Sequence, residues 1–214
     1  MSILSIFTIL LSRLSGQEDI VIGTPVAARR HTDLEKIIGM FVNTLALRNK
    51  PFGNKTLNEF ITELKEQTLE AFENQEYPFE ELVEKIVIGR DMGRNRLFDV
   101  IFNLLTSPED PEKLKEKPDY KEMVHISGTS KFDLTLTALD FGTQTLFSIE
   151  YCSRLFKPQT IERFISYFKQ ILNILAVNSN PLLSELAIIT PSEKEQILFE
   201  FNSIETQYPN NKTI

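Results

Sequence analysis

The apolar residues of this chain alternate between two spacings, one typical of strands and one typical of helices. Short apolar runs and two-residue alternation predict strands at residues 19–23, 41–47 and 97–105. Apolar residues three and four positions apart predict helices at 56–74 and 158–176. Because strands alternate with helices along the chain, we predict an α/β fold with a mixed sheet of about five strands covered by helices.

Local signals mark where several of these elements begin and end. Thr56 and Glu59 form a capping-box pattern at the start of one helix, and Pro78 and Pro158 suit the first turns of two others. The segments FDLTLTALD and TLFSIEY alternate on either side of Phe141 and Gly142, which predicts a β-hairpin. Thr190, followed by proline, predicts a last short helix.

Residues 3–11 are nearly all apolar and could be mistaken for a signal peptide. No basic residue precedes them, and the run is too short to span a bilayer. We therefore predict a buried helix here and no membrane partner.

Composition excludes several classes of function. A net charge of −7 and 30 acidic against 23 basic residues leave no basic stripe for a nucleic acid. The single cysteine, Cys152, excludes an internal disulfide and a cysteine-cluster metal site, and it favours a reducing compartment such as the cytoplasm. The two histidines, His31 and His125, stand in no metal-binding or acid–base spacing, so we predict no metal site.

Three other segments contain polar residues and match none of the sites excluded above. The first runs IGTPVAAR at 22–29 and continues as IGMFVNTLALR at 38–48. The second is NQEYPFE at 74–80, and the third is RDMGRNRLF at 90–98.

These three segments resemble, in order, core motifs of the condensation domains of non-ribosomal peptide synthetases, which serve antibiotic and other secondary-metabolite biosynthesis. The second is similar to the family's H/N-Q-D-Y-P-F-E and the third to R-D-x-S-R-N-P-L-F. The lead-in SGQEDIVIGTP and the ending ITPSEKEQIL also resemble the family, so the resemblance covers essentially the whole chain. The motif residues it singles out are Gly23, Pro25, Arg29, Gly39, Arg48, Gln75, Tyr77, Pro78, Phe79, Arg90, Asp91, Arg94 and Asn95.

The resemblance implies a fold and a division into domains. Condensation domains have two lobes of the chloramphenicol-acetyltransferase type, and this chain resembles only the C-terminal one, at residues 1–201. Residues 202–214 are expected to be a linker-like tail. The resemblance also implies a segment that bridges to the other lobe, for which the loop and hairpin at 106–151 are the candidate. An ordinary hairpin packed on its own lobe is the alternative.

The family's H-H-x-x-x-D-G motif, whose second histidine is held to promote attack of the acceptor amine, belongs to the other lobe and has no counterpart here. No residue of this chain is therefore predicted to be catalytic. The chain also departs from the family at Ala28, where glycine is usual, and at Gly93 and Arg96, where serine and proline are. The last two put the fine geometry of the third motif in doubt.

The motif residues allow two interpretations. In the structural one they are a framework: Tyr77 to Phe79 fix the entry of a helix, and the arginines satisfy carboxylates or backbone carbonyls. In the functional one, Asn43 lies on a strand beside the channel between the lobes and orients the acceptor or a phosphopantetheine arm. Asn43 is the candidate because an amide in an apolar strand needs a polar partner.

Three hypotheses for the function follow. The first is the C-terminal half of a condensation domain that contributes to amide-bond formation between carrier-tethered thioesters and is inactive alone. Its implied partners are an N-terminal lobe, peptidyl carrier proteins and an adjoining adenylation domain, with phosphopantetheine as the carriers' arm and no bound cofactor. The second is a catalytically silent docking module. The third, an independent acyltransferase using His31 or His125, lacks any base-and-orienter spacing.

Overall fold

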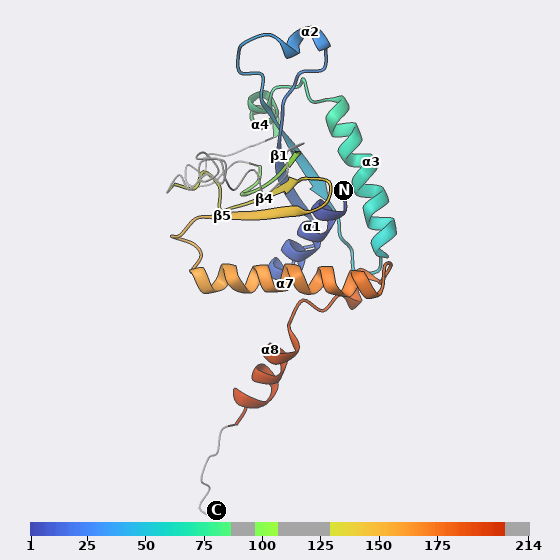
Figure 1. Ribbon diagram of the computed structural model, residues 1–214, viewed down its shortest axis with the longest axis vertical. Coiled ribbons are helices and arrows are strands. Elements are labelled where there is room, and N and C mark those ends of the chain that lie inside the picture. The colour runs from blue at the N-terminus through green and yellow to red at the C-terminus, as the bar shows by residue number, and fades with distance from the viewer. Residues whose placement is uncertain (87–96, 107–128, 204–214) are drawn as a thin grey trace, which may run out of the picture.

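A computed structural model describes residues 1–86, 97–106 and 129–203. Its described residues form a mixed five-stranded sheet in the order β2-β1-β3-β4-β5 (Figure 1). The outer pairs β1–β2 and β4–β5 are antiparallel, whereas β3 runs parallel to both β1 and β4. The strands are β1 (Ile20–Val26), β2 (Asn43–Asn49), β3 (Val100–Thr106), β4 (Leu134–Asp140) and β5 (Thr145–Tyr151). The predicted α/β fold with a mixed sheet is confirmed.

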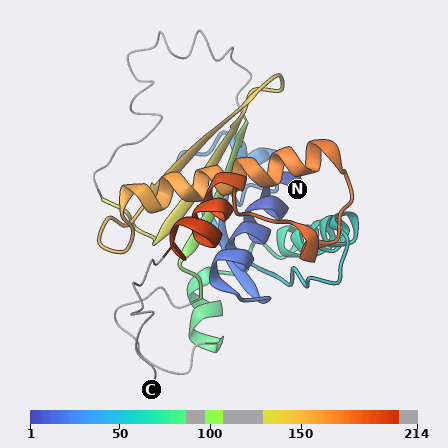
Figure 2. The same cartoon turned by 90° about the horizontal axis from the view of Figure 1, so that it is seen from below.

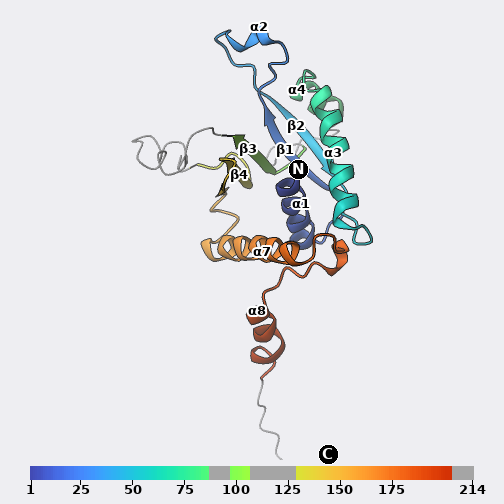
Figure 3. The same cartoon turned by 45° about the vertical axis from the view of Figure 1, so that its right-hand side comes forward.

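Three long helices enclose the core together with this sheet (Figures 1 and 3). They are α1 (Ser2–Ser15), α3 (Leu57–Glu73) and α7 (Pro158–Val177). The short helical elements are α2 (Thr32–Glu35), α4 (Phe79–Ile86), the 3₁₀ turn η1 (Leu183–Glu185), α8 (Pro191–Glu195) and the π-helical turn η2 (Gln196–Glu200).

The N-terminal apolar run is a buried helix, as predicted. Leu4 through Leu10 are all buried in α1, including two hydroxyl residues. Ser5 donates to the carbonyl of Ser2 at 2.8 Å and Thr8 to that of Leu4 at 2.7 Å, so neither hydroxyl is left without a partner. No helix in the described part of the chain is long and apolar enough to cross a membrane.

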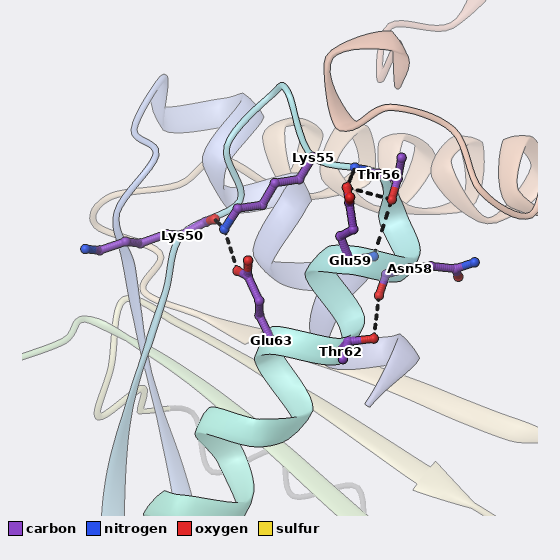
Figure 4. A network of polar contacts seen from close by, with 7 residues as sticks. All are labelled: Lys50, Lys55, Thr56, Asn58, Glu59, Thr62 and Glu63. Carbon is purple, nitrogen blue, oxygen red and sulfur yellow. Dashed lines mark hydrogen bonds and ion pairs between the residues drawn. The ribbon is translucent and has the colours of Figure 1, made fainter.

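The start of α3 is fixed by the predicted capping box (Figure 4). The Glu59 carboxylate accepts from the Thr56 backbone N–H at 2.7 Å, and the Thr56 hydroxyl accepts from the Glu59 N–H at 3.4 Å. The first bond, from the Thr56 backbone, lowers the pKa of Glu59. Beside it, the Lys55 ammonium binds the Glu63 carboxylate and, at 3.1 Å, the Lys50 carbonyl. These contacts anchor the loop that leads from β2 into α3.

Strand ends differ from those predicted. We predicted that β1 would end at Gly23, but it continues through Pro25 to Val26, and β2 begins at Asn43 rather than at residue 41. The prediction treated Pro25 as a strand breaker. Proline is tolerated where no ladder bond is lost, and β3 reaches β1 only at Gly23.

The predicted hairpin is confirmed and is part of the chain's own sheet. β4 and β5 pair along their whole length, and Gly142 in the connecting turn has a φ of 82°. β4 also pairs with β3 over seven residues. Most of the candidate bridging loop, at 107–128, lies outside the described residues, as does the tail from 204 onward. Cys152 follows β5 as a partly buried free thiol.

Candidate functional site

A loop of residues 27–42 projects from the end of the sheet and carries α2 (Figures 1 and 3). Arg29 holds this loop in shape from within. Its guanidinium donates to the carbonyls of Leu34, Ile37 (2.9 Å) and Gly39 (3.0 Å), and it lies 4.2 Å from the centre of the Phe41 ring. Arg29 and Gly39, both predicted as framework residues, are therefore brought together.

Four apolar side chains of this loop are exposed to water. Ile37 is 48 % exposed, Val42 60 %, Met40 93 % and Ile38 fully. Because the Arg29 guanidinium bonds three carbonyls of the loop, the loop has a defined shape, and the exposed side chains lie on that shape. A group of exposed apolar side chains is a candidate interaction surface. We call these four residues the loop tip.

Asn43, the predicted channel residue, lies where this loop enters β2, and its amide is used by backbone groups. Nδ2 donates to the carbonyls of Gln75 and Tyr77, at 2.8 Å each. Oδ1 accepts from the N–H of Thr44 at 2.8 Å and from that of Phe79 at 3.3 Å. Asn43 therefore ties the start of β2 to the turn before α4. The expectation that its amide needs a partner is met by that turn, and its predicted contact with a substrate remains a prediction.

The second motif forms the turn between α3 and α4. The Gln75 side chain donates to the Phe72 carbonyl at 2.9 Å, at the end of α3, and Pro78 immediately precedes α4. The Lys85 ammonium lies 5.1 Å from the centre of the Tyr77 ring. Side chains and backbone of this motif thus shape the turn, as the framework interpretation predicts.

A row of aromatic rings connects this turn to the sheet. The Phe79 ring centre lies 5.5 Å from that of Phe98, the last residue of the third motif, and Phe98 lies 6.0 Å from Phe132. The Phe98 ring also covers Gly23 so closely that a Cβ there would come within 2.2 Å of it. Gly23 of the first motif, Phe79 of the second and Phe98 of the third therefore meet at one point. We call these three residues the motif junction.

Arg48, the last residue of the first motif, pairs with Asp19 across the opposite end of β1 and β2. Its Nε and Nη2 donate to the two carboxylate oxygens at 2.9 and 2.6 Å. This hydrogen bond lowers the pKa of Asp19. The pair borders an open groove of about 800 Å³ between the strands and α4, lined also by Val21, Ala46 and Leu82. Pro25, which was also predicted as a framework residue, lies near the end of β1 with its side chain exposed.

The remaining predicted residues are not part of this arrangement. Arg90, Asp91, Arg94 and Asn95 lie outside the described residues, and so does His125. His31 is exposed on the projecting loop, just before α2. In the described ranges, no group of three His, Cys, Asp or Glu side chains is placed to hold a metal ion.

Sequence reasoning missed two features of this region. Arg30 ties the projecting loop to the end of α3, donating to the Glu73 carbonyl at 3.1 Å and lying 3.9 Å from the Glu76 carboxylate. The exposed loop tip was missed because Ile37, Ile38 and Met40 are residue types that usually predict burial. Their position next to Gly39, just after a segment that contains Asp33, Glu35 and Lys36, was the available signal.

Replacing Asn43 by aspartate tests the tie to the turn. The change keeps the acceptor but sets an oxygen against two backbone carbonyls, so we expect a loss of about 1.5–2 kcal/mol in the free energy of unfolding. Urea denaturation measures it. Asn173→Asp is the matched control, because Asn173 is exposed on α7. Equal losses in the two variants would contradict a role for the Asn43 amide.

Comparison with known proteins places the chain in one family. The family model described as "Condensation domain" matches residues 1–198. Gramicidin S synthase 2 of Brevibacillus brevis is 46 % identical over the whole chain, and bacitracin synthase 3 of Bacillus licheniformis is 42 % identical over the whole chain. The chain spans only 5 % and 3 % of the lengths of these two relatives.

Solved structures share the fold. A holo four-domain non-ribosomal peptide synthetase bound to AMP and glycine matches 93 % of this chain with a TM-score of 0.79, at 23 % identity and over 16 % of its own length. The first condensation domain of the CDA synthetase matches 88 % of this chain with a TM-score of 0.68, at 16 % identity and over 42 % of its own length.

Proposed function

The chain belongs to the condensation-domain family of non-ribosomal peptide synthetases, and we propose that it is the C-terminal lobe of such a domain. In the reaction we propose, the acceptor amine attacks the donor thioester carbonyl. A C–N bond forms, the C–S bond breaks, and the donor carrier's phosphopantetheine thiol is released. The amine proton passes to a base on the N-terminal lobe, which carries H-H-x-x-x-D-G, and from that base to the departing sulfur, so the base is regenerated.

The division into lobes is supported by the extent of the structural matches. The match covers 88 % of this chain but only 42 % of the CDA synthetase condensation domain. For the condensation domain of the monacolin K polyketide synthase the two shares are 83 % and 41 %. A chain that corresponds to less than half of such domains fits one lobe of two. We propose residues 1–201 as that lobe and 202–214 as its linker-like tail.

The single observation that carries the proposed contact between the two lobes is the loop tip. Ile37, Ile38, Met40 and Val42 present apolar surface to water on a loop that Arg29 and Arg30 hold in place. Such surface is stabilised by burial, at about 25 cal/mol per Å². We propose that the loop tip packs on the N-terminal lobe, in addition to the bridging segment proposed at 106–151.

We propose that Asn43 lies beside the channel between the lobes and orients the acceptor or the phosphopantetheine arm through the turn that its amide holds. All the hydrogen-bonding groups of its amide face backbone at 44 and 75–79. We propose that it positions the wall formed by the turn and α4. We further propose peptidyl carrier proteins and an adjoining adenylation domain as partners, with no cofactor held by this lobe.

The experiment mixes the chain with a separately produced N-terminal lobe, taken from the part of gramicidin S synthase 2 that precedes the matched segment. Donor and acceptor carrier proteins are added, and the dipeptidyl thioester is measured by mass spectrometry. We expect no product from the chain alone, because the general base is absent and proton transfer contributes about 10²–10⁴-fold. The mixture should form product.

Variants of the loop tip make the test specific. Ile38→Asp and Met40→Asp should prevent association and product formation, because a charge would enter the apolar contact. Val177→Asp is the matched control, since Val177 is 92 % exposed at the end of α7. Deleting the hairpin is a poor test, because it removes β4 and β5 from the sheet. Carrier binding without association of the lobes would favour the silent docking module instead.

A further inference from the structure

The last described segment, α8 followed by η2, stands away from the body of the molecule as an arm (Figures 1 and 3). The chain before it is anchored, because Leu183 and Leu186 are both 2 % exposed in the core. Ile189, by contrast, is 44 % exposed. The arm therefore starts from a fixed point, and its direction depends on contacts beyond residue 189.

Those contacts gather at three side chains, two from α7 and one from α8. The Tyr167 hydroxyl donates to Oε1 of Glu193 at 2.6 Å, and Nη2 of Arg163 donates to the Tyr167 hydroxyl at 2.8 Å. The same Arg163 nitrogen lies 2.5 Å from Oε1 of Glu193. The three groups form a closed triangle between the two helices.

The triangle lies at the boundary between core and solvent. Tyr167 is 5 % exposed, the Glu193 side chain 17 % and the Arg163 side chain 62 %. Burial, followed by the hydrogen bond to Glu193, raises the pKa of the Tyr167 phenol, so it stays a neutral donor. Losing Glu193 would take from the hydroxyl of this buried tyrosine the acceptor that it has in the structure, which favours the closed form.

The triangle borders an open groove between the arm and α7. The groove, of about 720 Å³, has Ser166 on one wall and Thr190 and Gln196 on the other. Figure 2 shows α8 on the near side of α7, with the sheet behind. The apolar residues of the arm that line the groove, Ile197 and Phe201, are 41 % and 66 % exposed, so they contribute little buried contact with α7 beside the triangle.

We propose that Arg163, Tyr167 and Glu193 form a clamp that sets the direction of the arm relative to α7. The clamp thereby sets where Ser203, the last residue that the structure describes, lies relative to α7. This inference does not rest on the proposed catalytic function, because it concerns only contacts within this chain.

The test measures the distance between α7 and the arm in the full chain. Spin labels are placed at Glu162→Cys and Phe199→Cys in a Cys152→Ser background, since both labelled positions are exposed. Pulsed electron paramagnetic resonance should give one narrow distance distribution. Tyr167→Phe should broaden it, because the ring stays in the core while the bond to Glu193 is lost.

Two further variants define the outcome. Glu193→Ala should broaden the distribution as Tyr167→Phe does, whereas Glu195→Ala, a neighbouring exposed acid outside the triangle, should leave it narrow. A narrow distribution in Tyr167→Phe and Glu193→Ala, or a broad one in the parent, would overturn the proposal.

Amide hydrogen exchange separates the clamp from a purely structural role. We expect Tyr167→Phe to lose protection at residues 191–201 while residues 161–171 of α7 keep theirs. If Tyr167→Phe loses amide protection equally in α7, the phenol stabilises the core and does not set the direction of the arm. That result would contradict the proposed clamp.

Discussion

Replacing Phe168 by alanine is expected to lower the free energy of unfolding by about 3–5 kcal/mol. Phe168 is 7 % exposed and belongs to the core between α7, α1 and the sheet. Its ring meets that of Phe147 edge to face, with the centres 5.3 Å apart. The substitution removes this contact and leaves a cavity, and both losses add to the cost. Urea denaturation followed by circular dichroism measures it.

Phe199→Ala is the matched control for this prediction. It is the same chemical change on η2, where the side chain is 69 % exposed, so we expect an effect within about 0.5 kcal/mol. Similar losses in the two variants would mean that Phe168 is not part of the core, and the packing of α7 described here would then be incorrect.

Helix periodicity predicted the buried face of α7 but not how far its burial extends. Ile161, Phe168 and Ile171 are buried as predicted, whereas Ile165 and Leu172 are each 36 % exposed. The helical spacing of the apolar residues predicts one stripe formed by Ile161, Phe164, Ile165, Phe168, Ile171, Leu172 and Leu175. This stripe is wider than the surface that α1 and β4–β5 cover. Spacing reports which residues share a face, but the area of the partner surface depends on tertiary structure.

Strand pairing could not be read from the local pattern. The two-residue alternation predicted the β4–β5 hairpin, because a short turn joins its strands. The parallel pairing of β3 with both β1 and β4 joins segments far apart in sequence. Alternation indicates which face of a strand is buried but not which strands lie beside it. The order of the strands in the sheet was therefore known only from the structure.

The candidate site shows the same difference between what the sequence predicts and what the tertiary structure decides. A polar amide in an apolar strand predicted that Asn43 has a partner, and it has one. That partner is backbone at residues 75–79, more than thirty positions away, as the separations of 32 and 34 to its two acceptors show. Chemistry predicts the need for a hydrogen bond, whereas the fold decides which distant groups satisfy it.

Gly23→Ala is expected to cost about 3 kcal/mol, because the motif junction leaves no room for a methyl group. An added Cβ would lie 2.2 and 2.5 Å from two atoms of the Phe98 ring and 2.6 Å from Cδ1 of Ile101. The end of the Ile101 side chain can turn away at small cost. The Phe98 ring cannot move as easily, because it is 5 % exposed and lies between Phe79 and Phe132.

Gly53→Ala is the control, since a Cβ there would be 3.4 Å from its nearest neighbour, Ser184, and we expect little change. A double-mutant cycle with Phe98→Leu then locates the clash. If the ring is the obstacle, Gly23→Ala should cost at least about 1 kcal/mol less in the Phe98→Leu background than in the parent. An unchanged cost would place the strain in the backbone of β1.

The same variant links the framework to the proposed function. Phe98 contacts Phe79, and the Phe79 N–H binds Asn43, so a displaced Phe98 ring would move the turn before α4. In the two-lobe mixing assay, Gly23→Ala should therefore reduce product formation even at a temperature where the variant remains folded, and Phe98→Leu should restore part of it. If the folded variant forms product at the parent's rate, the motif junction serves stability alone and does not position the channel wall.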